Sequence, residues 1–457
     1  MSYTTAQLAG FCGGRLIGSG GAEVLWATND QRTIGAPGAL FCCFAGAKSD
    51  GHAYVRAALE AGAVAALVEE RKVPELLAEG PLAMDLVAVP NVPSALWLIA
   101  ECCRESWRGP TVATTGSAGK TTTKNMLRGI LEGALGGGLS TRGNNNNLLG
   151  VPLTLVGLGE RHHFLNLELG SNAPGEIGRL ALLALPDVAV ITAVLEAHLE
   201  GFGSLSGVLL EKSSLGRVVG EGGYVVVPSY VAALAERPFR GRCVKFGHEA
   251  GDYVRLSGAR ETAAGCAAEI EVDGRAYDLE LPVPGVFNLR NAAAALAAAT
   301  MLGVPAEAAI ESLHRFEPEA MRMQVVEAGG VTFLVDAYNA NPGSMEAALQ
   351  SLAQRQAVGR KIAVLGGMWE LGVESVALHE RVGAYAATLG LGLVAVGPGS
   401  SDYLRAHGGE PSVFQEDAVG AAAWLRQNLS RGDLVLLKGS RSARMERVLS
   451  ALQGEVA

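Results

Sequence analysis

The clearest pattern of apolar and polar positions lies in the last third of the chain. Short apolar runs, which predict buried strands, alternate there with longer stretches of helical character. In chain order the expected elements are strand Thr332–Asp336, helix Ser344–Gln354, strand Lys361–Leu365, helix Val376–Thr388, strand Leu393–Val396, helix Ala418–Gln427, strand Asp433–Lys438 and helix Ser442–Leu452. This order predicts an open, doubly wound α/β sheet, whose ligands bind beyond the carboxyl ends of the strands.

The middle of the chain has the same alternation with an addition. A helix is expected at Ser94–Ser106, and apolar strands at Thr111–Thr114, Phe164–Leu169 and Val188–Val194. Helical segments separate these strands, so a parallel sheet covered by helices is expected. Asp273-Gly274, between strand-like runs at Ala267–Val272 and Arg275–Leu281, predicts an antiparallel hairpin attached to this sheet. An alanine-rich helix is expected at Asn291–Met301.

The first 90 residues predict a smaller α/β unit. Its expected elements are a helix near Thr5–Cys12, a buried strand within 38–44, a helix that begins at Asp50-Gly-His52 and a strand at Val64–Val68. Pro90 and Pro93 then mark a boundary. We therefore expect three α/β domains, at residues 1–90, 91–318 and 319–457.

Composition restricts the class of protein. Of the 457 residues, 49% are hydrophobic and 18% charged, which is typical of a globular chain and excludes a disordered one. The net charge of −9, without a long basic run, argues against nucleic acid or an anionic membrane as partner. The cysteine count of seven is odd and no C-x-x-C occurs, so free buried thiols are expected. Neither a signal peptide nor a membrane span is visible, and a cytoplasmic location is expected.

The most informative motif is Thr114-Thr-Gly-Ser-Ala-Gly-Lys-Thr-Thr122. It follows an expected strand and precedes a helix, which is the context of a phosphate-binding loop. Gly116 and Gly119 allow the backbone N–H groups to turn toward one anion, Lys120 would neutralise phosphate charge, and the Thr121 hydroxyl would bind Mg²⁺. Thr114 occupies the position of the usual first glycine. The alternative is an ordinary helix entry with a solvated lysine.

The stretch Thr115–Thr123 resembles the ATP loop of the Mur ligases, which build the peptide stem of bacterial cell-wall precursors. Further similarities follow in chain order at Asp30–Arg32, Gly38–Phe41, Asp50–His52, Glu168–Ile177, Ala197–Ser204, Glu211-Lys212, Asp336–Met345, Glu370–Gly372, His379, Lys438–Arg441 and Met445-Glu446. They are most similar to the branch of the family that adds D-alanyl-D-alanine to UDP-N-acetylmuramoyl-tripeptide. The resemblance implies a UDP-substrate domain, a central P-loop ATPase with a parallel sheet and a C-terminal Rossmann-like domain.

The resemblance also implies roles for individual residues. ATP would contact Gly116, Ser117, Ala118, Gly119, Lys120, Thr121, Thr122, Asn288, Asn291, Arg322 and Asp336. Two Mg²⁺ sites would use Thr121, Glu168, His198 and a carbamylated Lys212, and Lys120, His198 and Lys212 would be the catalytic residues. The substrates would contact Asp30, Arg32, Asn144, Asn147, Tyr338 and Asn339. The implied product is an amide formed through an acyl phosphate. Separately from the resemblance, we expect a monomer.

Each of these residues also has a plainer interpretation. Glu168 could cap a helix or form an ion pair, and Asp336 could cap a turn. His198 could be a structural histidine and Lys212 a surface lysine. Asn144–Asn147 could form only a polar loop.

Seven positions depart from the family pattern. Asn145 and Leu148 stand where an aromatic residue and an acid are usual, Phe287 replaces a histidine, and Gly367 replaces an aspartate. Gln31 and Ser214 replace a serine and a glutamate, and Trp369 is also unusual. Because several of these positions fall where substrates are expected, two alternatives stay open. One is a related ligase acting on a different carboxylate, and the other is a non-catalytic ATP-binding scaffold.

Overall fold

The computed structural model describes residues 3–46, 49–234 and 239–453, which form two compact units. The first unit comprises residues 1–113, 134–171 and 176–187, and the second comprises 114–133, 172–175 and 188–457. The expected α/β class is confirmed in both. The three domain boundaries expected from the sequence stay predictions. In the described part of the chain no helix is long and apolar enough to cross a membrane.

A five-stranded sheet, in the order β2-β7-β6-β5-β4, organises the first unit. Its strands are β2 (Arg15–Ile17), β4 (Trp26–Thr28), β5 (Ala39–Cys42), β6 (Ala63–Glu69) and β7 (Asp85–Val89). Only the β2–β7 pair is antiparallel. Beside this sheet lies a short ribbon of β1 (Tyr3–Thr4) and β3 (Glu23–Val24).

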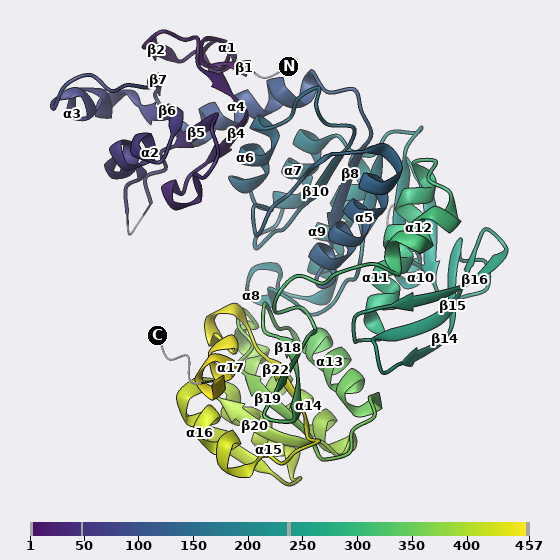
Figure 1. Ribbon diagram of the computed structural model, residues 1–457. Coiled ribbons are helices and arrows are strands. Elements are labelled where there is room, and N and C mark those ends of the chain that lie inside the picture. Colours follow the sequence, from purple (N-terminus) through teal and green to yellow (C-terminus); the bar gives the residue numbers. More distant parts are fainter. Residues whose placement is uncertain (1–2, 47–48, 235–238, 454–457) are drawn as a thin grey trace. The chain divides into compact units, whose positions relative to one another are not determined.

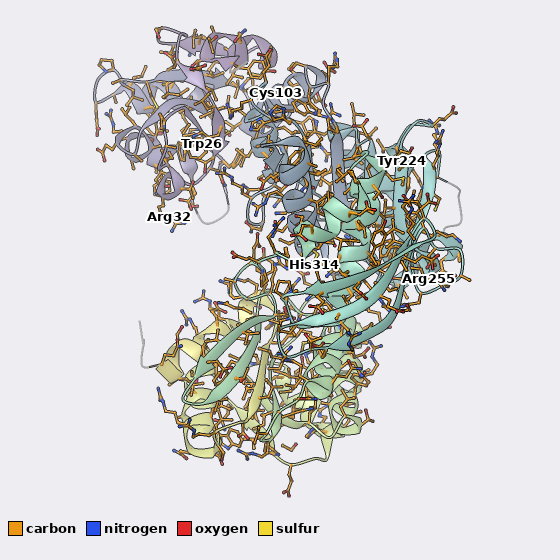
Figure 2. All side chains as sticks on the ribbon, turned by 45° about the vertical axis from the view of Figure 1, so that its right-hand side comes forward. Trp26, Arg32, Cys103, Tyr224, Arg255 and His314 are labelled. Atoms are coloured by element: carbon orange, nitrogen blue, oxygen red, sulfur yellow. The ribbon has the colours of Figure 1, made fainter. Side chains whose placement is uncertain are left out.

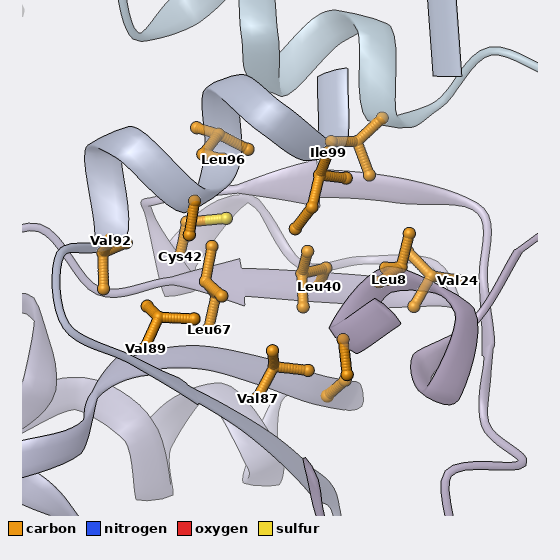
Figure 3. Close-up of a cluster of buried hydrophobic side chains, with 14 of the residues drawn as sticks. Leu8, Val24, Leu40, Cys42, Leu67, Val87, Val89, Val92, Leu96 and Ile99 are labelled. Carbon is orange, nitrogen blue, oxygen red and sulfur yellow. The ribbon is translucent and has the colours of Figure 1, made fainter. Parts of the chain in front are cut away.

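Alternate side chains of these strands supply two separate cores. One face packs Leu40, Leu67 and Val87 against α1 (Thr5–Cys12), α4 (Val92–Glu105) and α6 (Gly150–Val156), as Figure 3 shows for α1 and α4. The other face includes Phe41 and Ala66. It is packed by residues of α2 (Val55–Glu60) and α3 (Val73–Leu77), which follow the short 3-10 turns η2 (Gly51–Tyr54) and η3 (Glu70–Lys72).

The first unit also contains β9 (Leu139–Ser140), paired in parallel with β10 (Leu165–Glu168), and helix α7 (Glu176–Ala184). Arg104 of α4 ties α7 in place by donating to the carbonyl oxygens of Ala184 at 2.6 Å and Leu185 at 2.7 Å. Strand β8 (Thr111–Thr115) and helix α5 (Lys120–Leu135) flank the glycine-containing motif, which belongs to the second unit.

Within the second unit, six strands lie side by side in chain order. They are β11 (Val188–Ile191), β12 (Tyr224–Pro228), β13 (Arg242–Gly247), β14 (Val254–Glu261), β15 (Cys266–Val272) and β16 (Arg275–Leu281). The pairs from β11 to β14 are parallel, and β14, β15 and β16 are antiparallel, so the hairpin expected at Asp273-Gly274 is confirmed. The accompanying helices are α8 (Leu199–Phe202), α9 (Leu205–Val218), α10 (Ser229–Leu234), α11 (Phe287–Met301) and α12 (Ala306–Leu313).

Residues 292–299 of helix α11 are apolar on all sides. Every residue from Ala292 to Ala299 is 0% exposed, and the helix contacts β11, β12, β13, β14 and β15. Small side chains permit this close approach of a helix to a sheet. The helix begins at Phe287, four residues before the expected start, and therefore includes Asn288 as well as Asn291.

The last third forms a six-stranded sheet in the order β17-β18-β22-β19-β20-β21. Its strands are β17 (Gln324–Ala328), β18 (Val331–Asp336), β19 (Lys361–Gly366), β20 (Gly392–Val396), β21 (Ser412–Gln415) and β22 (Leu434–Lys438), with only β17 antiparallel. The accompanying helices are α13 (Pro342–Gln354), α14 (Ser375–Thr388), α15 (Leu404–His407), α16 (Ala418–Asn428) and α17 (Glu446–Gln453), all labelled in Figure 1. The doubly wound sheet is confirmed, with α16 and α17 on one face and α13 contacting the strands as well.

One expected helix begins later than predicted. Arg441–Ala443 forms a 3-10 turn, and α17 starts only at Glu446 because Arg444 has a left-handed backbone with φ of +50°. The edge strands β17 and β21 were not predicted. Their side chains are half-buried or exposed throughout, so neither strand carries the apolar run that marks the inner strands.

Candidate active site

The loop after β8 has the geometry of a phosphate-binding loop. Gly116 and Gly119 have φ values of +150° and +81°, which glycine adopts without strain. A Cβ at Gly119 would lie 2.2 Å from Asn291 Oδ1. Ser117 fixes the loop through its backbone and its side chain. Its backbone N–H donates to the Ala193 carbonyl at 2.7 Å, and its hydroxyl donates to the Leu195 carbonyl and accepts from the Leu195 N–H.

Lys120 and Thr121 begin α5, at the positive end of the helix. The Lys120 ammonium turns back over the loop and donates to the Gly116 carbonyl at 2.7 Å. Thr121 is buried, and its hydroxyl accepts from the Arg322 guanidinium at 2.8 Å. An arginine 201 residues later in the sequence therefore reaches the threonine expected to bind Mg²⁺.

The two asparagines of α11 lie directly beside this loop. Asn291 donates to Asn288 Oδ1 at 3.0 Å, and Asn288 donates to the Pro284 carbonyl at 2.7 Å. Both side chains are buried, and Asn291 Oδ1 is the atom that a side chain at Gly119 would meet. Phe287, one of the departures from the family pattern, is the first residue of the same helix.

His198 and Lys212 form the second part of the site. The His198 ring bonds the Glu370 carboxylate through Nδ1, and Lys212, 1% exposed on α9, holds its ammonium 5.4 Å from the centre of the Phe202 ring. Burial lowers the pKa of His198. Glu370 opposes this shift, whereas the charges of Lys120 and Lys212 favour it. The lowered pKa favours the neutral imidazole, which is the form that ligates metals.

Glu168 ends β10 in the first unit, where its side chain is 2% exposed. Asn146 donates to its Oε1 at 2.8 Å, whereas Oε2 has no hydrogen-bond partner among the described residues. A buried carboxylate oxygen without a donor is costly unless a cation binds it. The described residues contain no group of three or more His, Cys, Asp or Glu side chains that could hold a metal. The donors present nevertheless fit Mg²⁺, which takes one or two carboxylates together with phosphate oxygens.

Asp336 and the residues after it lie at the carboxyl end of β18. The Asp336 carboxylate pairs with Lys438 at 2.5 Å, directly across from it on β22. Lys438 also donates to the Asn339 carbonyl at 3.1 Å. The Tyr338 ring lies 4.0 Å from the guanidinium carbon of Arg322. This strand end therefore orients the arginine that reaches Thr121.

The expected substrate contacts in the first unit lie in two places. Asp30 and Arg32 pair at 2.7 Å, and the Arg32 side chain is 81% exposed. Arg32 is labelled in Figure 2. Asn144 is exposed, while Asn147 accepts from the backbone N–H groups of Leu149 at 3.0 Å and Gly150 at 2.9 Å, where α6 starts. These two hydrogen bonds agree with the plainer interpretation, in which Asn147 is a loop residue.

Several residues that contact the site were not assigned a role from the sequence. Asn146 holds Glu168, Glu370 holds His198, and Asn341 donates to the Ser117 carbonyl at 3.3 Å. Thr192 donates to the Ala118 carbonyl at 2.5 Å. Asn146 and Glu370 belong to motifs that were recognised, whereas Thr192 has no motif of its own.

Known proteins resemble this chain over its whole length. Residues 114–299 match the Mur ligase middle domain, and residues 321–441 match the Mur ligase glutamate ligase domain. The UDP-N-acetylmuramoyl-tripeptide--D-alanyl-D-alanine ligase of Escherichia coli (strain K12) is 32% identical over 99% of each chain.

Solved structures agree. MurF from Acinetobacter baumannii is 29% identical over 99% of each chain, with a TM-score of 0.84. The MurF ligase from Thermotoga maritima in complex with ADP is 28% identical, over 94% of this chain and 97% of that one, with a TM-score of 0.80. The likeness first visible in the phosphate loop thus extends through both matched domains, and the chain belongs to the Mur ligase family.

Proposed function

We propose that the chain is the ATP-dependent ligase that joins D-alanyl-D-alanine to UDP-N-acetylmuramoyl-tripeptide in peptidoglycan precursor synthesis. The observation that carries the proposal is the loop at Gly116–Thr121, with Lys120 folded over it and Arg322 bonded to Thr121. Relatives of this activity that match the chain end to end support the choice of substrates.

The reaction proceeds in two displacements. A carboxylate oxygen of the tripeptide attacks the γ-phosphorus, the bond to the β,γ-bridging oxygen breaks, and ADP leaves. The amine nitrogen of D-alanyl-D-alanine then attacks the acyl carbon, phosphate leaves, and the nitrogen loses a proton. Lys120 and Arg322 offset the negative charge that develops on the phosphoryl oxygens, which is the main electrostatic requirement of such a transfer. Bound Mg²⁺ would supply further charge screening.

The metal ligands and the oligomeric state belong to the same proposal. Thr121, Glu168 and His198 would hold Mg²⁺ at two sites, with Lys212 carbamylated. Deep burial of Lys212 supports carbamylation, because a carboxylate-like group on that nitrogen replaces a buried ammonium by a cation ligand. We further propose that the protein is a cytoplasmic monomer. Sedimentation of the purified protein would test the oligomeric state.

Each unit would contribute its own substrate contacts. Exposed Arg32 supports a contact with the nucleotide diphosphate, because a guanidinium binds phosphate oxygens in pairs. Asn144 and Asn147 would face the peptide carboxylate, and Tyr338 and Asn339 the incoming amine. Asn288, Asn291 and Asp336 would lie around the nucleotide.

ADP release tests the proposal directly. Turnover with the tripeptide and D-alanyl-D-alanine is expected, together with its loss in Lys120→Ala and its retention in Arg128→Ala, which removes an exposed cation from the same helix. Turnover only with another carboxylate would instead support a related ligase. ATP binding without turnover on any pair would support a scaffold.

A further inference from the structure

Glu261 is a buried carboxylate to which the sequence motifs assign no role. It ends β14, and its side chain is 2% exposed. Its Oε1 accepts from the backbone N–H groups of Gly285 at 3.1 Å and Val286 at 2.9 Å. These two amides form the turn that leads into α11. The charge thus fixes the start of the helix that carries Asn288 and Asn291.

The same carboxylate holds the end of α13. The Ser351 hydroxyl donates to Glu261 at 2.7 Å, and the Arg355 guanidinium lies 3.4 Å away. Arg355 follows the last residue of α13 and also donates to the carbonyl oxygens of Gly265 at 3.3 Å and Ala263 at 3.0 Å. Arg355 and Ser351 are both buried. Removing one partner of a buried, hydrogen-bonded ion pair strongly destabilises the folded protein, because the other charge is left buried without compensation.

From the turn, two hydrogen bonds lead to Asn291, which packs against the phosphate loop. The Pro284 carbonyl accepts from Asn288, which accepts from Asn291, and Asn291 Oδ1 fills the space beside Gly119. Displacement of the turn at Gly285 would therefore move the asparagines that pack on the loop.

Helix α13 is fixed at its other end as well. Asn341 caps the helix through Ser344 and donates to the Ser117 carbonyl of the phosphate loop. The helix contacts β14 and β22, and all three elements are labelled in Figure 1. One end of α13 is therefore attached at the phosphate loop, and the other end at Glu261.

These contacts point to Glu261 as a positioning residue with two separable effects. We infer that its bonds to Gly285 and Val286 set the nucleotide affinity by placing Asn288 and Asn291. Its bonds to Ser351 and Arg355 set the turnover rate by holding α13, and with it the part of the chain that delivers Arg322 to Thr121. The inference rests on the proposed ATP-dependent ligation.

The test compares variants that remove one effect or both. Ser351→Ala removes only a bond between Glu261 and α13, and Arg355→Met removes the ion pair together with the bonds to Gly265 and Ala263. In both variants kcat should fall about tenfold while the ADP Kd, measured by calorimetry, changes less than twofold. Glu261→Gln also weakens the bonds to the turn and should raise the ADP Kd about tenfold. Arg355→Lys, which keeps the charge, should recover part of the lost kcat. Glu271→Gln, which alters an arginine pair on β15, is the matched control and should resemble the unaltered protein.

The possible results separate the two claims. An unchanged ADP Kd in Glu261→Gln would overturn the effect on Asn288 and Asn291, and an unchanged kcat in Arg355→Met would overturn the effect on α13. Variants that lower only the melting temperature would reduce Glu261 to a structural role. ADP binding that survives Lys120→Ala undiminished would instead count against the proposed function, irrespective of Glu261.

Discussion

His198 and Glu370 face each other from segments 172 residues apart, and both have a left-handed backbone, with φ of +53° and +62°. The imidazole Nδ1 bonds the carboxylate, and the Glu370 carbonyl accepts from the Glu200 backbone at 3.1 Å. Left-handed backbone is unfavourable for residues with a Cβ and persists where surrounding contacts require it. A carboxylate on one ring nitrogen directs the other toward a metal.

The first prediction follows from this pair. Glu370→Gln is expected to lower turnover roughly tenfold and to raise the Mg²⁺ concentration needed for half-maximal rate, because an unoriented histidine binds a cation less well. Its ADP affinity without Mg²⁺ should not change. Glu374→Gln, an exposed neighbour, is the control, and identical behaviour of the two variants would contradict the prediction.

Gly119 and Gly133 of the same loop and helix should respond oppositely to alanine. Gly119→Ala places a Cβ against Asn291 in a left-handed backbone, so about 1–2 kcal/mol of stability and at least tenfold in ATP affinity should be lost. Gly133 lies exposed in α5 with no heavy atom within 4 Å of the place a Cβ would take, and Gly133→Ala should stabilise by about 0.5 kcal/mol. Urea unfolding and ATP titration measure both. Equal effects of the two substitutions on stability and on ATP affinity would contradict this prediction.

Gly367 illustrates a departure from the family pattern that the structure explains. A Cβ there would lie 2.6 Å from the Pro398 carbonyl oxygen, a backbone atom that cannot easily move. Restoring the usual residue by Gly367→Asp is therefore expected to cost about 1–3 kcal/mol through overpacking, without raising kcat. Gly137→Asp, where the space is open, should cost much less in the same denaturation experiment. A faster Gly367→Asp enzyme would show the prediction to be wrong.

The Asp50 carboxylate should make stability depend on acid pH. Burial raises the pKa of Asp50, but hydrogen bonds from His52 and Lys72 outweigh this and lower it to about 2. Because the folded pKa lies below the unfolded value of about 3.9, the contribution is complete above that pH and is lost as the pH falls toward 2. The stability deficit of Asp50→Asn should thus narrow from pH 5 to pH 3 in urea titrations. A deficit independent of pH would exclude this ionisation.

The helices, the strands and the phosphate loop could be predicted because each depends on residues close together in the sequence. Contacts between residues far apart in the sequence could not be predicted. Strands such as Lys361–Gly366 carry unbroken apolar runs, and Gly116 to Thr121 form a compact motif. The contact between Glu261 and Arg355 joins positions 94 residues apart, and neither residue lies in a motif.

The free cysteines are confirmed, although Cys243 is exposed and Cys12 and Cys102 are only partly buried. These three thiols are accessible because short strands and helix faces leave one side to solvent.

Helix α11 carries a restriction of a different kind. Since every side of Ala292–Ala299 touches protein, a larger residue at any of these positions has no direction in which to extend. Among natural variants and in saturation mutagenesis, substitutions that enlarge the side chain at these positions should be rejected. Exchanges to glycine and serine should be tolerated. The asparagines beside the phosphate loop therefore stand on a helical segment that has no free volume in which to rearrange.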